Sequence, residues 1–249
     1  MNPIAQFEAE REERIAQLGQ DTAFQAQSRS WLEQSMRKQY VYNFSWLGRP
    51  IIQNPIDMVA MQELIWRVQP DLIIETGIAH GGSIIFSASM LELNAACGGN
   101  PEAQVIGIDI DIREHNRLAI LTHPMAKRIR MVQGSSVAPE VVAQVQEAAQ
   151  GRSRIMVFLD SNHTHEHVLA ELNAYAPLVS VGSYCVVFDT FVEDVPADVF
   201  EQRPWAPGNS PKTAVHAYLE ANRQFEIDQS MHHKLQITVA PDGFLRRIF

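Results

Sequence analysis

Short apolar runs alternate with helical patterns through the central part of the chain. The runs predict strands at residues 72–75, 105–109, 129–132, 155–159 and 184–188. The patterns before and between them predict helices at residues 55–68, 82–93, 115–121, 139–149 and 163–175. Continuous apolar strands that are separated by helices are typical of a parallel sheet covered on both faces. The chain is therefore predicted to adopt a doubly wound, Rossmann-like α/β fold.

The N-terminal part has a different pattern. Between Ile4 and Gln39, apolar residues recur at irregular helical spacing among Glu, Arg and Gln, which predicts one or two amphipathic helices. A loop is expected over residues 43–54. We interpret residues 1–54 as a helical extension and residues 55–249 as a single α/β domain. The exposed helical arm could have no role at a site, or its apolar face could pack on a second subunit.

The C-terminal part is predicted to contain a loop, a helix and a strand pair. Residues 195–211 include four prolines, so this segment can hold little regular structure and is expected to lie as a loop over the site. A helix is expected over residues 212–222. Two strand-like runs, 235–239 and 244–249, are joined by a Pro-Asp-Gly turn and predict an antiparallel hairpin.

Composition and charge narrow the classes of function. A chain of 249 residues with 46% hydrophobic content can bury one sizeable core. The 20 Lys and Arg against 29 Asp and Glu give a net charge of −9, which argues against nucleic acid or an anionic membrane as a partner. The two cysteines, Cys97 and Cys185, are not in a metal-ligand spacing, and no apolar run has the roughly 18 residues of a spanning helix. We expect a reduced, cytoplasmic protein.

Ligands bind at the carboxyl ends of strands in an open parallel sheet, so the residues after each strand are the candidates for chemistry. The first strand leads into the sequence ETGIAHGGS (residues 75–83). Its glycines allow close backbone approach, but they do not have the spacing of a dinucleotide fingerprint or of a P-loop. An acidic residue here would repel a pyrophosphate, yet it suits the cationic methionine moiety of S-adenosylmethionine. The candidate cofactor residues in this loop are Glu75, Thr76, Gly77, His80, Gly81 and Ser83.

The next two strands also end in polar residues. Asp109 directly follows an apolar run and could accept hydrogen bonds from both ribose hydroxyls, and it is preferred to Asp111 for that reason. The alternative for either residue is a solvated helix N-cap. After the third strand, Ser135 and Ser136 could contact the adenine or only cap the following helix.

Asp160 and Asp189 end the fourth and fifth strands. Two carboxylates in one crevice would repel each other unless a cation such as Mg²⁺ lay between them. His163 lies three positions after Asp160 and is predicted to be the general base, with helix capping or packing as the alternative. A zinc site is disfavoured because H-E-x-x-H is absent, and His165 and His167 are expected at the surface or in packing.

With these residues in view, the chain resembles the cephalosporin hydroxylase/rhamnosyl O-methyltransferase family of class I methyltransferases, which are related to macrolide sugar O-methyltransferases. The resemblance runs from about residue 46 to residue 190. Its motifs are WLGRPIIQNP (46–55), DLIIETGIAHGGS (71–83), IGIDID (106–111) and LDSNH (159–163). It implies binding of S-adenosylmethionine and Mg²⁺, with Asp160 also bordering the cofactor.

The resemblance further implies a role for each residue of the acidic pocket. Asp160 takes a metal-ligand position and His163 takes the position of the base. Relatives place a Glu-Asp pair after the fifth strand, where this chain has Phe188 and Asp189. Thr190 is therefore the candidate third ligand, and Glu193 is an alternative.

We predict an S-adenosylmethionine-dependent O-methyltransferase that acts on a hydroxyl of a small molecule, such as a sugar moiety or a secondary metabolite. The resemblance also implies a homo-oligomer. Two alternatives remain open at this point. One is a metal-dependent hydroxylase or a hydroxylase accessory subunit, and the other is a cofactor-binding scaffold without catalysis, which the presence of Phe188 makes tenable.

Overall fold

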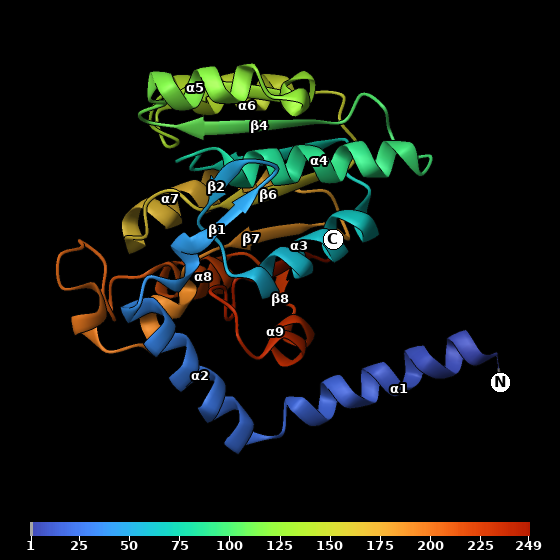
Figure 1. Ribbon diagram of the computed structural model, residues 1–249, viewed down its shortest axis with the longest axis vertical. Coiled ribbons are helices and arrows are strands. Elements are labelled where there is room, and N and C mark those ends of the chain that lie inside the picture. The colour runs from blue at the N-terminus through green and yellow to red at the C-terminus, as the bar shows by residue number, and fades with distance from the viewer. Residues whose placement is uncertain (1) are drawn as a thin grey trace.

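A seven-stranded sheet lies at the centre of the computed structural model, which describes residues 2–249 (Figure 1). The strand order is β5-β4-β3-β6-β7-β9-β8, and the neighbours from β5 to β7 run parallel. The strands are β3 (Leu72–Thr76), β4 (Gln104–Asp109), β5 (Ile129–Gln133), β6 (Ile155–Leu159), β7 (Tyr184–Val187), β8 (Phe225–Ile227) and β9 (Phe244–Arg247). The five predicted strands are confirmed. Met1, the first residue of the expected extension, lies outside the described residues.

Helices cover both faces of this sheet, as predicted. They are α3 (Pro55–Val68), α4 (Gly82–Ala96), α5 (Glu114–Leu121), α6 (Pro139–Ala149), α7 (His165–Tyr175), α8 (Pro211–Ala221) and α9 (Gln229–Leu235). Side chains alternate between the faces along β3. Ile73 packs in the apolar cluster that contains α3 and α4, whereas Leu72 and Ile74 pack in the cluster of α6, α7 and α8. This alternation directs Glu75 toward α4.

The N-terminal extension consists of two helices, α1 (Pro3–Leu18) and α2 (Thr22–Arg37). α1 buries none of its residues and projects from the body of the molecule (Figure 1). Its last turn meets the segment after α9, where the Gln236 side chain donates to the Leu18 carbonyl. Within residues 2–249, no helix combines the length and the apolar character needed to cross a membrane.

The loop expected over residues 43–54 is more regular than predicted. After a 3-10 turn η1 (Tyr40–Asn43), the strands β1 (Phe44–Trp46) and β2 (Arg49–Ile51) form an antiparallel hairpin. Leu47 and Gly48 both have positive φ, 45° and 84°, as a tight two-residue hairpin turn requires. The hairpin directs the following residues, including Gln53, to the edge of the main sheet.

The C-terminal antiparallel pair is confirmed, but the first of its two predicted strands is wrong. β9 pairs with β8 and not with residues 235–239. Leu235 ends α9, and the backbone N–H of Val239 donates to the buried Asp57 carboxylate instead of to a strand. Apolar spacing over residues 235–239 therefore marks burial of an irregular segment. The remaining 3-10 turns are η2 (Pro124–Arg128), η3 (Ala176–Leu178), η4 (Thr190–Asp194) and η5 (Ala197–Phe200).

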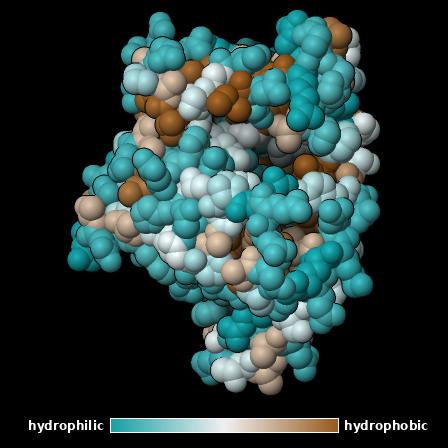
Figure 2. All heavy atoms as spheres, turned by 90° about the vertical axis from the view of Figure 1, so that its left-hand side faces the viewer, coloured by the Kyte–Doolittle hydropathy of each residue, from teal (hydrophilic) through white to brown (hydrophobic). Residues whose placement is uncertain are grey.

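The topology of the sheet determines where a ligand can bind. β3 lies between β4 on one side and β6 on the other, so the direction of chain winding reverses between β3 and β6. Loops after these two strands separate and leave a crevice at their carboxyl ends. Figure 2 looks onto this end of the sheet, and the surface there is hollowed.

Candidate active site

A cleft of about 690 Å³ opens at the carboxyl ends of β3, β6 and β7. This volume lies within the range of roughly 300–1,000 Å³ that is usual for small-molecule sites. Its inner wall is the glycine-rich loop after β3, and its floor contains Asp160, His163 and Asp189. Its outer walls come from the segment after α2 and from the proline-rich loop at residues 195–211. Residues of that loop between 198 and 205 line the cleft, and its role as an active-site loop remains a prediction.

The glycine-rich loop is held close to the end of β6. Gly77 has φ of 91°, and a Cβ at this position would overlap the carbonyl oxygen of Asp160. The Asp109 carboxylate accepts hydrogen bonds from the backbone N–H groups of Ile78 and Ala79, at 2.8 and 3.1 Å. Asp109 thus shapes the loop, and its predicted contact with a ribose remains a prediction.

Arg49 and Asn116 hold the other side of the same loop. The Arg49 guanidinium donates twice to the His80 carbonyl and once to the Asn116 side chain. Asn116 in turn donates to the Ala79 carbonyl at 2.9 Å. Since Ala79 has a positive φ of 45°, which is unusual for a residue with a Cβ, these contacts stabilise a strained loop. Sequence reasoning missed both residues because their sequence separation from the loop hides the contact.

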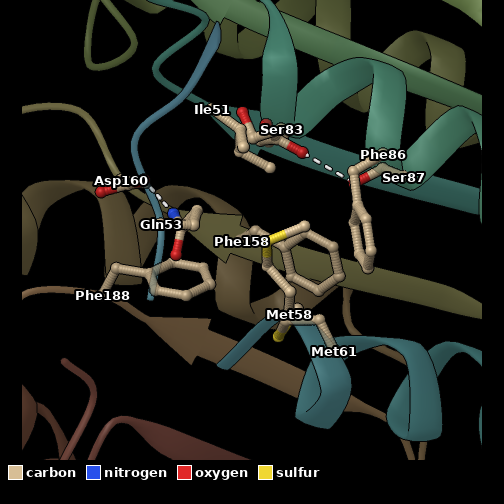
Figure 3. A pocket seen from close by; sticks show the side chains of 11 residues that line it. Ile51, Gln53, Met58, Met61, Ser83, Phe86, Ser87, Phe158, Asp160 and Phe188 are labelled. Carbon is tan, nitrogen blue, oxygen red and sulfur yellow. Dashed lines mark hydrogen bonds between the residues drawn. The ribbon is translucent and has the colours of Figure 1, made fainter. Parts of the chain in front are cut away.

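Glu75 points into a small internal cavity beside the cleft. The carboxyl is 3% exposed, accepts from the Ser87 hydroxyl at 3.0 Å, and has one oxygen without a partner among residues 2–249. Burial raises the pKa of Glu75 to about 7, against hydrogen bonds from serines that lower it. The cavity of about 30 Å³ can hold a water molecule, and it is bordered by Phe158, Phe188 and Asp160 (Figure 3).

Asp160, His163 and Asp189 form one cluster, as the sequence predicted. One ligand atom from each lies within 4.8 Å of the others. His163 Nε2 lies 3.1 Å from Asp189 Oδ2. Asp189 has a left-handed backbone with φ of 55°, a strained conformation that is common at functional sites. Asp160 is held by Gln53, whose side-chain N–H donates to Asp160 Oδ2 at 2.8 Å (Figure 3).

The two carboxyls of this cluster resist ionisation. Burial raises the pKa of Asp160 well above its ordinary value, and the negative charges of Asp189, Glu75 and Glu171 raise it further. Burial also raises the pKa of Asp189, which His163 opposes. A cation placed between the two carboxylates would relieve the repulsion.

The candidate third ligands lie away from this cluster. The buried Thr190 hydroxyl donates to the Pro241 carbonyl at 2.6 Å, because the chain turns into η4 at this residue. The Glu193 carboxylate accepts from the Gly208 N–H and from the Ser210 hydroxyl. Phe188 is buried against the small cavity. Among residues 2–249, the third side chain that approaches Asp160 and Asp189 is that of His163.

Ser136 belongs to a buried network behind the cleft. Its hydroxyl donates to Glu171 Oε1 at 2.5 Å, and the Ser161 hydroxyl donates to the same oxygen at 2.7 Å. His167 Nε2 lies 3.0 Å from the Ser136 hydroxyl, so this histidine has a packing role, one of the two expected for it. Neither Ser135 nor Ser136 lines the cleft. Sequence reasoning missed Glu171, which links the loops after β5 and β6.

The comparison with known families identifies this arrangement. Residues 38–248 match the family described as Rhamnosyl O-methyltransferase/CmcI. The chain belongs to this family. The rhamnosyl O-methyltransferase of Mycobacterium tuberculosis (strain H37Rv) is 31% identical over 220 residues, which cover 84% of this chain and 82% of that protein. The rhamnosyl O-methyltransferase of Mycobacterium leprae is 29% identical and covers 87% of this chain and 90% of its own length.

Solved structures of the same fold confirm the architecture. CmcI with Mg and S-adenosylmethionine aligns with a TM-score of 0.56 at 19% identity, over 84% of this chain and 78% of CmcI. The O-methyltransferase TomG from Streptomyces achromogenes, in complex with S-adenosylmethionine, aligns with a TM-score of 0.56 at 15% identity, over 89% of this chain and 90% of TomG. The predicted family and fold are confirmed, and the chain is an S-adenosylmethionine-dependent O-methyltransferase.

Proposed function

We propose that this protein methylates a hydroxyl that has a second oxygen beside it, that Asp160 and Asp189 hold a Mg²⁺ ion, and that His163 accepts the hydroxyl proton. The proposal rests on the three-residue cluster at the floor of the cleft. Because the cluster adjoins the glycine-rich loop, an acceptor and a methyl donor can lie together in one cleft.

The donor set fits a hard cation. Mg²⁺ prefers carboxylate oxygens, and it usually keeps several ligands from water or substrate, so two protein carboxylates are sufficient. Gln53 donates to one oxygen of Asp160 and leaves the other oxygen available. When bound, Mg²⁺ supplies Lewis acidity that favours the deprotonated form of a hydroxyl. Because Phe188 is not acidic, oxygens of solvent or of the acceptor would complete the shell, and His163 remains available to accept the proton.

His163 suits the removal of a proton. Its side chain is only 13% exposed, and its contact with Asp189 restrains the orientation of the ring. The same carboxylate stabilises the imidazolium that forms when His163 takes the proton. The nearby Trp205 ring meets His163 edge-on and limits access of water to it.

The methyl donor is proposed to lie along residues 75–83. The loop is preorganised by Asp109, Arg49 and Asn116, so little ordering is needed when the cofactor binds. Glu75 is proposed to face the cationic end of S-adenosylmethionine through the small cavity. Thr76, His80, Gly81 and Ser83 are proposed to contact the cofactor. The names of the mycobacterial relatives favour a rhamnosyl hydroxyl, and more broadly a sugar hydroxyl, as the acceptor.

We also propose that the protein is a cytoplasmic homo-oligomer. α1 exposes Ile4 and Phe7, which are 69% and 59% accessible, and a second copy would bury them. Neither Cys97 nor Cys185 forms a disulfide, as is usual in a reducing compartment. Light scattering on the full chain measures the mass of the assembly in solution. Phe7→Ser removes apolar surface that a second copy would bury, so the measured mass of the assembly should fall toward that of a single chain.

The experiment that tests the function combines calorimetry with a turnover assay. S-adenosylhomocysteine should bind, and transfer of a labelled methyl group to a rhamnoside should require Mg²⁺. Asp160→Asn should abolish the Mg²⁺-stimulated turnover, while binding of S-adenosylhomocysteine changes little. Asp21→Asn, which replaces one good helix cap of α2 with another, is the matched control. Unchanged turnover in Asp160→Asn would contradict the proposal that Asp160 holds a catalytic Mg²⁺ ion.

A further inference from the structure

The outer half of the cleft is formed by two segments that are far apart in the sequence. Residues 36–42 include the end of α2 and the turn after it, and residues 198–205 belong to the proline-rich loop. We propose that this half is a carbohydrate subsite in which Trp205 packs against the acceptor ring and Asn54 donates a hydrogen bond to it. The proposal rests on the methyltransferase function proposed above and names the residues that select the acceptor.

Trp205 is next to the reacting centre. Its ring centroid lies 4.7 Å from that of His163, and the two planes meet at 87°. The Arg203 guanidinium lies 5.3 Å from the Trp205 centroid. Any acceptor whose hydroxyl reaches His163 therefore has Trp205 as its neighbour. Indole surfaces bind the hydrocarbon face of a ring through dispersion and burial.

The segment that carries Trp205 lacks regular structure, but hydrogen bonds hold it in place. Asn209 donates to the Pro204 carbonyl at 2.8 Å and accepts from the His165 backbone N–H. The Glu193 carboxylate accepts hydrogen bonds from the Gly208 N–H and from the Ser210 hydroxyl. These contacts lie on the C-terminal side of Trp205, so the indole is held against His163 before an acceptor arrives.

A second contact holds the loop on the other side of Trp205. Arg37 at the end of α2 makes a two-pronged contact with Asp198, at 2.9 and 3.1 Å. This ion pair joins the two outer walls of the cleft. Because Arg37 and Asp198 are 40% and 63% exposed, this pair orients the two walls toward each other but holds them only weakly.

The polar lining of the cleft is rich in amides. Gln39, Gln53, Asn54 and Gln202 all border it. An amide both donates and accepts, which matches sugar hydroxyls. The Asn54 side chain is 1% exposed, and its oxygen accepts from the Ile56 N–H. Its Nδ2 has no partner among residues 2–249, so a buried donor is left for a ligand oxygen.

The combination favours a saturated ring over an aromatic one. A pyranose presents a hydrocarbon face to the indole and hydroxyls around its edge to several amides. A catechol has only two oxygens, both of which would be engaged near Asp160 and Asp189. A catechol would then have no oxygen left for these amides, so it would form fewer hydrogen bonds in the cleft than a pyranose does.

The test uses methyl α-L-rhamnopyranoside and catechol as probes of the full protein with S-adenosylhomocysteine and Mg²⁺. The rhamnoside should bind more tightly than catechol. Trp205→Ala should weaken rhamnoside binding at least about tenfold, and Trp205→Phe should recover most of it. S-adenosylhomocysteine should bind within about twofold of wild type in both variants. Trp66→Ala, which removes a Trp that is 51% exposed on α3 and lines neither cavity, should bind both ligands normally.

A second variant tests the amide. Asn54→Ser keeps a good N-cap for α3 but removes the buried N–H donor. Rhamnoside binding should fall about threefold to tenfold with little change in the unfolding midpoint. Rhamnoside affinity equal to wild type in Asn54→Ser would contradict the role of Asn54.

The carbohydrate subsite is contradicted by unchanged rhamnoside affinity in Trp205→Ala, by parallel loss of S-adenosylhomocysteine affinity in that variant, or by tighter binding of catechol than of the rhamnoside. If wild type binds S-adenosylhomocysteine and Mg²⁺ but neither ring, the subsite is refuted while the transferase function stands. If S-adenosylhomocysteine itself does not bind, the proposed function fails.

Discussion

Replacing Gly77 with Ala adds one methyl group, which should disturb both the glycine-rich loop and the cluster that contains Asp160. Gly77 directly follows β3, has φ of 91°, and lies against the backbone of Asp160. The new Cβ would overlap the Asp160 carbonyl oxygen and lie 2.8 Å from its carbonyl carbon and 3.2 Å from Ser161 Cα. Because these are backbone atoms, no side-chain rotation can relieve the contact. The end of β6 must move.

Two effects add in this variant. Left-handed backbone in a residue with a Cβ costs about 1–2 kcal/mol. Overpacking against rigid neighbours costs a further ~1–3 kcal/mol. Displacement of Asp160 by about 1 Å should lower turnover about a hundredfold, since reacting groups tolerate little misplacement. Gly98 separates the two effects, because its φ is 93° and nothing lies within 4 Å of an added Cβ.

The assay compares Gly77→Ala with Gly98→Ala by urea unfolding, methyl transfer and S-adenosylhomocysteine binding. Gly98→Ala should lose only the ~1–2 kcal/mol of backbone strain and keep wild-type turnover. Gly77→Ala should lose more stability, lose about two orders of magnitude in turnover, and bind the cofactor product more weakly. The reasoning is refuted if both variants lose equal stability and Gly77→Ala turns over within about threefold of wild type.

Three further predictions concern other parts of the molecule. Burial raises the pKa of Asp57 from 3.8 to about 7, so the native state binds this proton more tightly than the unfolded state does. The contribution of Asp57 to the free energy of unfolding is therefore complete below pH 3.8 and is lost as the pH rises through about 7. Asn does not titrate, so the free energy of unfolding of wild type, measured relative to Asp57→Asn in urea, should be lower at pH 7.5 than at pH 4 by up to ~4 kcal/mol. A difference between the two proteins that does not change with pH would contradict this. His163→Gln should lower kcat about 10²–10⁴-fold, with S-adenosylhomocysteine affinity unchanged. Turnover within about threefold of wild type would exclude His163 as the base. Arg49→Lys should weaken S-adenosylhomocysteine binding about fivefold to tenfold by loosening the His80 carbonyl, and calorimetry that detects no loss would show that the loop holds without Arg49.

The elements and the ends of the strands were predictable from the sequence because their signals are local. Apolar runs of strand length, interrupted by helical patterns, predict a sheet that is covered on both faces, and the structure contains it. Each residue that follows a strand must lie at the carboxyl edge. Asp160, His163 and Asp189 could therefore be brought together without coordinates.

The direction of side chains in irregular segments was decided only by the tertiary structure. Thr190 and Asp189 are neighbours in sequence, yet the turn into η4 directs the Thr190 hydroxyl to Pro241. Gln53 reaches Asp160 across 107 positions because a hairpin that resembles a loop in sequence delivers it. No periodicity encodes such contacts.

The same limit applies to the strand pair and to the outer cleft. Residues 235–239 have the apolar and polar alternation of a strand, but the Val239 N–H donates a hydrogen bond to the Asp57 carboxylate. The strand that pairs with β9 is β8. Trp205 lies in a proline-rich segment without a pattern, and contacts from Glu193, Asn209 and Arg37 hold its loop over the cleft. The local sequence determined which helices and strands form, and which acidic residues follow the strands at the carboxyl edge of the sheet. Long-range hydrogen bonds and packing, which depend on the whole chain being folded, decided which side chains meet there.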